Sequence, residues 1–92
     1  MANSAFRLEA SFDEKTGHVV AVYLRVREGS VANTKEVDQG VAYADYDSEG
    51  LLLGIELLGP CQVSVLDSIA ENEPEPIGQF LRGSVPRELV ST

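Results

Sequence analysis

The sequence predicts an α+β domain in which an antiparallel meander of four to five strands has one face covered by short C-terminal helices. Three observations lead to this fold class. Apolar and polar residues alternate over 5–58, which is the period of half-buried strands. Single glycines interrupt this pattern at intervals of about ten residues, as turns between short strands do. Beyond Gly59-Pro60 the apolar spacing changes to that of helices, so the sheet is expected to end there.

Five alternating segments are expected to be strands, over 6–12, 18–27, 31–38, 41–47 and 51–58. The second is rich in β-branched residues, which argues against a helix. The third is polar and contains Lys35, so we place it at an edge of the sheet, where a charged side chain discourages further pairing. The segment SEG at 48–50 joins the last two strands. It suits a hairpin with a bulge, because its glycine comes last.

The C-terminal third is predicted to be helical. An apolar stripe at helical spacing marks a helix over 61–71, formed by Cys61, Val65, Leu66, Ile69 and Ala70. The acidic segment 72–76 contains two prolines and is expected to be a linker that ends this helix. A short helical tail follows over 76–92, with a second stripe at Ile77, Phe80 and Leu81. Residues 1–92 are expected to form a single domain.

Composition narrows the classes of function. The chain has 15 acidic and 7 basic residues, a net charge of −8, which argues against nucleic-acid binding. This charge favours a basic partner surface, or it simply marks an acidic solvent-exposed face. The apolar run 51–58 is too short to span a membrane, and the start MANSAFRLEA lacks the pattern of a signal peptide. We therefore expect a soluble, cytoplasmic protein with no membrane partner.

Residues 45–56 read DYDSEGLLLGIE and match the spacing of a calcium-binding loop, except at the fifth position. The matching residues are Asp45, Asp47, Gly50 and Glu56, and Glu49 is the departure. Such a loop lies between two helices, whereas the flanks here are strand-like. The sequence therefore predicts a hairpin turn. A site for a divalent metal or a small ligand is the alternative, and it would use Asp38, Asp45, Asp47, Glu49 and Glu56.

Few residues are candidates for chemistry. His18 is the only histidine and opens a strand, where an exposed polar residue is ordinary. Cys61 is the only cysteine, which excludes an intrachain disulfide; its thiol is either activated near a helix start or buried as a small apolar group. Asp45 interrupts an apolar strand and, if buried, needs a partner such as Arg25 or Arg27. We predict no catalytic residue and no cofactor; a small enzyme built around His18 or Cys61 is a minor alternative.

Three consecutive segments carry a family resemblance: VANTKEV (31–37), DQGVAYADYDSEG (38–50) and LLLGIELL (51–58). They resemble the YuzE-like small bacterial family of domains of unknown function, over about residues 12–58. The chain departs from that pattern at Asn33, where arginine is usual. The resemblance implies a compact sheet-plus-helix domain without established catalytic residues. It also implies that the chain is an antitoxin-like companion of a neighbouring gene product, because some members of the family resemble the antitoxin half of a toxin–antitoxin pair.

The sequence therefore favours a non-enzymatic protein-interaction domain that binds another protein or itself, a homodimer being one such assembly. The tail 76–92 is the predicted contact segment because it is more apolar than a tail needs to be. The apolar residues expected to make this contact are Ile77, Phe80, Leu81, Leu89 and Val90. The alternative is that the tail completes the core of the monomer.

Overall fold

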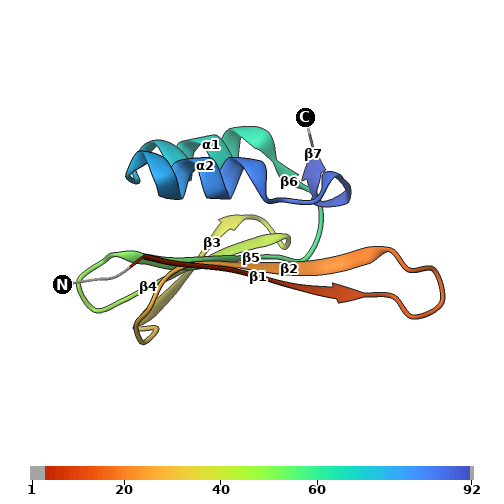
Figure 1. Ribbon diagram of the computed structural model, residues 1–92, viewed down its shortest axis with the longest axis horizontal. Coiled ribbons are helices and arrows are strands. Elements are labelled where there is room, and N and C mark those ends of the chain that lie inside the picture. Colours follow the sequence, from red (N-terminus) through yellow and green to blue (C-terminus); the bar gives the residue numbers. More distant parts are fainter. Residues whose placement is uncertain (1–3, 92) are drawn as a thin grey trace.

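The computed structural model describes residues 4–91. Five strands form one antiparallel sheet in the order β1-β2-β5-β4-β3, and two helices lie in a layer over one of its faces (Figure 1). The strands are β1 (Ser4–Phe12), β2 (Val19–Arg27), β3 (Asn33–Asp38), β4 (Ala42–Tyr46) and β5 (Leu52–Leu57). The α+β class and the helices on one face are therefore confirmed.

The sheet consists of a hairpin and a meander that meet in its middle. β1 and β2 form the hairpin, β3, β4 and β5 form the meander, and β5 pairs with β2. The link 28–32 carries the chain from β2 to β3 at the opposite edge. β5 is almost entirely apolar and takes the centre of the sheet, whereas the polar β3 lies at an edge, as predicted.

The C-terminal part contains α1 (Val63–Glu71), α2 (Glu75–Gly83), a 3-10 helix η1 (Arg87–Leu89) and two short parallel strands, β6 (Cys61–Gln62) and β7 (Val90–Ser91). The first helix begins two residues later than expected because Cys61 and Gln62 pair with β7. Glu75 and Pro76, expected in the linker, belong to the first turn of α2, where proline costs no hydrogen bond. None of the helices described is long and apolar enough to cross a membrane.

The core lies between the sheet and the helices. Its fully buried members from the central strands include Leu24, Ile55 and Leu57. Leu66 and Ala70 of α1 and Ile77 and Leu81 of α2 close it from above, and Leu89 closes one end.

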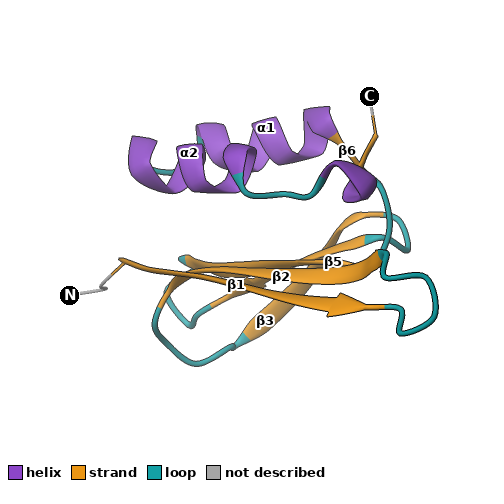
Figure 2. Cartoon of the chain, turned by 45° about the vertical axis from the view of Figure 1, so that its right-hand side comes forward, coloured by secondary structure: helices purple, strands orange, loops and turns teal. Residues whose placement is uncertain are grey.

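The two ends and the two faces of the sheet differ. The β1–β2 hairpin extends past the helix layer, which gives the molecule a long axis of 42 Å against 25 and 23 Å (Figure 1). Phe12 and Val20 lie on this projecting part and are about half exposed. No helix or strand of the described chain covers the second face of the sheet, which we call the open face (Figure 2).

Candidate functional site

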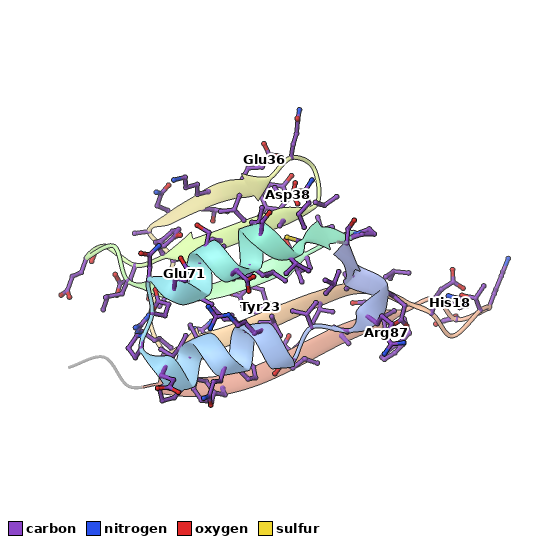
Figure 3. The ribbon with its side chains drawn as sticks, turned by 90° about the horizontal axis from the view of Figure 1, so that it is seen from above. His18, Tyr23, Glu36, Asp38, Glu71 and Arg87 are labelled. Carbon is purple, nitrogen blue, oxygen red and sulfur yellow. The ribbon has the colours of Figure 1, made fainter. Side chains whose placement is uncertain are left out.

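A groove of about 830 Å³ lies between α1 and the edge strand β3. β3 lies beside α1 rather than beneath it when the molecule is seen from the helix side (Figure 3). Five half-buried side chains form the apolar part of the groove: Val37, Tyr46, Leu51, Val65 and Ile69. Polar side chains complete the lining, among them Lys35, Ser64, Ser68 and Asn72. We call this feature the α1–β3 groove.

The helix wall of the α1–β3 groove follows from the width of the apolar stripe on α1. Leu66 and Ala70 point into the core and are buried. Val65 and Ile69 precede them by one residue, so they lie about 100° around the helix, towards the edge of the sheet. Both also pack against the core and remain half-buried, so they form a second apolar column that faces the groove as well as the core. This second column is the signal in the sequence for the helix wall of the groove.

Contacts at both ends hold α1 in place beside β3. At one end the Gln62 N–H donates to Asp38 Oδ2 at 3.0 Å. At the other end Arg27 forms a salt bridge of 2.9 Å with Glu73 and donates to the carbonyl oxygen of Leu52 at 2.8 Å. Because both charged side chains of the salt bridge are nearly buried, each needs the other, and the pair fixes the helix layer to the sheet.

Tyr46 places a hydroxyl group at the α1–β3 groove. Burial, with the negative charge of Glu73 as a second cause, raises the pKa of Tyr46 above its ordinary value. The hydroxyl therefore remains protonated at neutral pH and is available as a hydrogen-bond donor. The groove thus combines five apolar side chains with a larger number of polar and charged ones, so its lining is amphipathic.

The open face carries a hydrogen-bonded cluster that spans four strands. The Tyr23 hydroxyl donates to Asp45 Oδ2 at 3.0 Å, and the Thr34 hydroxyl donates to Asp45 Oδ1 at 2.6 Å. Tyr23 reaches Asp45 across Gly54, where a Cβ atom would overlap the tyrosine hydroxyl and lie 2.8 Å from the carbonyl oxygen of Leu24. Only glycine at this position allows the contact.

This cluster replaces the arginine partner that the sequence suggested for Asp45. Arg25 donates to the carbonyl oxygen of Gly29 instead, and Arg27 turns to Glu73 in the helix layer. The prediction of an arginine pair was wrong because Gly54 opens a path for Tyr23. Burial, followed by the hydrogen bond to Asp45, raises the pKa of Tyr23 to about 12. The Tyr23 hydroxyl thus stays protonated and holds the sheet together.

The acidic hairpin is a turn whose carboxylates have separate roles. Asp47 Oδ1 accepts the N–H groups of Glu49 and Leu51, both at 2.9 Å, and Gly50 adopts a φ of 84°. The register shifts between Asp45 and Tyr46, so the predicted hairpin with a bulge is confirmed. Glu56 faces outward between β2 and β4. Within residues 4–91, no three His, Cys, Asp or Glu side chains are placed to hold a metal ion.

The two residues considered for an enzyme lie in different surroundings. His18 is exposed at the tip of the β1–β2 hairpin, away from the helices (Figure 3). Cys61 is fully buried in β6. Burial, together with the nearby carboxylate of Asp38, raises the pKa of the Cys61 thiol to about 11, so the thiol is protonated at neutral pH. Cys61 therefore packs as a small apolar group, the second of the two readings the sequence left open.

The tail residues predicted to contact a partner lie mostly inside the monomer. Ile77, Leu81 and Leu89 are buried in the core. Phe80 is half-buried and stacks on Phe6 of β1 with the ring centroids 4.8 Å apart, and Val90 packs against the core from β7. In the monomer the tail therefore completes the core, the alternative to a contact segment.

Comparisons of the chain with protein-family models, with curated proteins and with solved structures gave no match. The resemblance of residues 12–58 to the YuzE-like family stays a prediction.

Proposed function

We propose that this is a non-enzymatic protein-interaction domain and that its α1–β3 groove binds an amphipathic helical segment of another protein. The observation that carries the proposal is the strip of half-buried apolar side chains within the otherwise polar groove, at the place where the helix layer stops short of the sheet edge. The polar clusters on the rest of the sheet support the non-enzymatic part, because their hydroxyl and carboxylate groups are used in hydrogen bonds to one another.

A helix suits the groove better than a strand does. A strand would have to pair with β3, which is six residues long, polar, bulged and guarded by Lys35. A helix would instead lie beside α1 as a third member of the same layer. Val65 and Ile69 are four residues apart, so they form a ridge that fits apolar residues at i and i+4 of a docked helix. A segment of about three turns would match the nine residues of α1.

The charge of the domain suggests the chemistry of the partner. A net charge of −8 attracts a basic protein and raises its rate of association. We therefore propose that the docked helix has an apolar face and a basic face. A cytoplasmic location and a partner encoded by a neighbouring gene, as in an antitoxin-like companion, are part of the same proposal and rest on the family resemblance.

The test compares variants in a pull-down from the native host, with the captured proteins identified by mass spectrometry. Ser68 is exposed and lines the groove, so Ser68→Arg would fill the groove without disturbing the core. Ser30→Arg is the matched control, because Ser30 is exposed and lies in the link between β2 and β3. We expect one stoichiometric partner with the wild-type protein and the control, and its loss with Ser68→Arg.

A second pair of variants tests the apolar character of the site. Leu51 lines the groove, whereas Leu58 is an exposed leucine outside it. Leu51→Asp should weaken binding of the captured partner by about tenfold or more, and Leu58→Asp should leave it unchanged. Equal binding by all four variants, or capture of no partner by the wild-type protein, would contradict the proposal.

A further inference from the structure

β1 is an edge strand with apolar side chains left exposed. In the described chain it pairs with β2 alone and is nine residues long; its register with β2 is unbroken over Arg7–Ser11 and shifts between Ser4 and Arg7 and between Ser11 and Phe12. Phe6, Leu8 and Phe12 are 47%, 42% and 58% exposed, and they account for half of the six large apolar side chains that the described residues leave exposed. A long apolar edge readily pairs with a strand of another chain.

The charged residues of β1 determine which kind of strand can pair with this edge. Leu8 and Ala10 lie opposite Leu24 and Val22 of the core, so they belong to the covered face. Arg7 and Glu9 lie on the open face, exposed and 3.2 Å apart. A basic and an acidic residue thus flank one apolar residue, a pattern that is complementary to itself when the strand direction is reversed.

Only one antiparallel register satisfies that pattern in a pair of identical strands. Centring the pair on Arg7 would set two arginines opposite each other, and centring it on Glu9 would set two glutamates opposite each other. Centring it on Leu8 places each Arg7 opposite the Glu9 of the other copy. Like charges directly opposite one another destabilise a strand pair, whereas opposite charges stabilise it.

We propose that two copies of the chain associate through antiparallel β1 strands about a two-fold axis at Leu8. The two five-stranded sheets would join into one continuous sheet with both helix layers on the same side. Leu8 would face Leu8 of the second copy, and both charge pairs would lie in the stretch of β1 whose register is regular. The stack of Phe6 on Phe80 would then lie between the two α2 helices, away from water on both sides. This contact uses the edge opposite the α1–β3 groove, so it is independent of the proposed function.

The test is an exchange of charges on the full chain, followed by sedimentation equilibrium at low ionic strength. Arg7→Glu and Glu9→Arg each create two like-charge pairs across the axis, so each should weaken the dimer by about tenfold or more. The double variant Arg7→Glu/Glu9→Arg restores both opposite-charge pairs and should return the dimer to the wild-type dissociation constant. Lys15→Glu makes the same change of charge in the turn outside the strand and should have no effect.

Both exchanged side chains are exposed, so the monomer should fold in every variant, which circular dichroism would check. In the wild-type dimer the outward-facing amides of β1 should exchange with solvent more slowly as the protein concentration rises. A wild-type protein that is monomeric at all concentrations would overturn the proposal. So would a dimer that withstands both single exchanges, or one that the double exchange fails to restore.

Discussion

Tyr23 and Leu24 are neighbours in β2, yet their side chains lie on opposite faces of the sheet in opposite surroundings. Leu24 is fully buried under the helices among apolar side chains. Tyr23 lies on the open face and is held by a hydrogen bond to Asp45, which also accepts the hydroxyl of Thr34. The covered face therefore depends on apolar area removed from water, and the open face depends on directed hydrogen bonds.

The two faces of the sheet stabilise the same strands by different interactions. On the covered face many side chains share the stabilisation, so each contributes in proportion to its buried volume. On the open face one glycine makes room for one tyrosine, and the cluster fails if that space is filled. On the covered face, the cost of a substitution should therefore follow the buried volume that it removes. On the open face, the cost should depend on whether the space at Gly54 is filled.

The largest effect is expected on the covered face. Leu24→Ala removes a fully buried side chain from the middle of the core and should lower the free energy of unfolding by about 3 kcal/mol. Leu58→Ala is the matched control, because Leu58 is about half exposed, and it should change that free energy by less than about 0.5 kcal/mol. Urea denaturation measures both. Equal losses of unfolding free energy would contradict the expectation that burial determines the cost of truncating a leucine side chain.

The second-largest loss of stability is expected at Gly54, where the lack of a side chain leaves room for Tyr23 on the open face. Gly54→Ala sets a Cβ atom against the Tyr23 hydroxyl and the carbonyl oxygen of Leu24, and it should cost about 2 kcal/mol. Gly83→Ala is the control, since a Cβ there meets no other atom and φ is not positive. If the tyrosine is the main obstacle, Gly54→Ala should cost less in a Tyr23→Ala background. A full cost in both backgrounds would assign the strain to the backbone of Leu24 instead.

The strands could be predicted because the alternation of apolar and polar residues is a local signal. Lys35 in a polar segment marked the edge strand, and the glycine of SEG marked the last hairpin; the structure confirms both. The parallel pair β6–β7 was missed. It joins Cys61 to Val90 across 29 positions with only two residues a side, which leaves no periodicity to detect.

The candidate site was harder to predict because its parts are distant in the chain. Val37, Tyr46 and Ile69 line one groove only after the link from β2 carries β3 to the far edge of the sheet. Asp45 was rightly singled out as a polar residue that needs a partner. The identity of that partner depends on Gly54 in the neighbouring strand, whose role is visible only once the register of β4 and β5 is known.

The smallest effect concerns the hydrogen bond of Tyr23 and its dependence on pH. Tyr23→Phe removes the donor and should cost about 1 kcal/mol at neutral pH. In the unfolded chain the Tyr23 hydroxyl ionises at its ordinary pKa of 10.0, whereas in the folded protein it stays protonated up to a pKa of about 12. Between these values the folded state binds more protons than the unfolded state, so the free energy of unfolding falls as the pH rises.

The difference between wild type and Tyr23→Phe isolates this contribution. Tyr43 and Tyr46 also have raised pKa values, so both proteins should lose stability in alkali for that reason. Only the wild-type protein loses the additional stability of Tyr23, and its advantage over the variant should therefore shrink from pH 10 to pH 12. Urea denaturation across this range measures it. A constant difference would show that neither burial nor the hydrogen bond to Asp45 raises the pKa of Tyr23 in the folded protein.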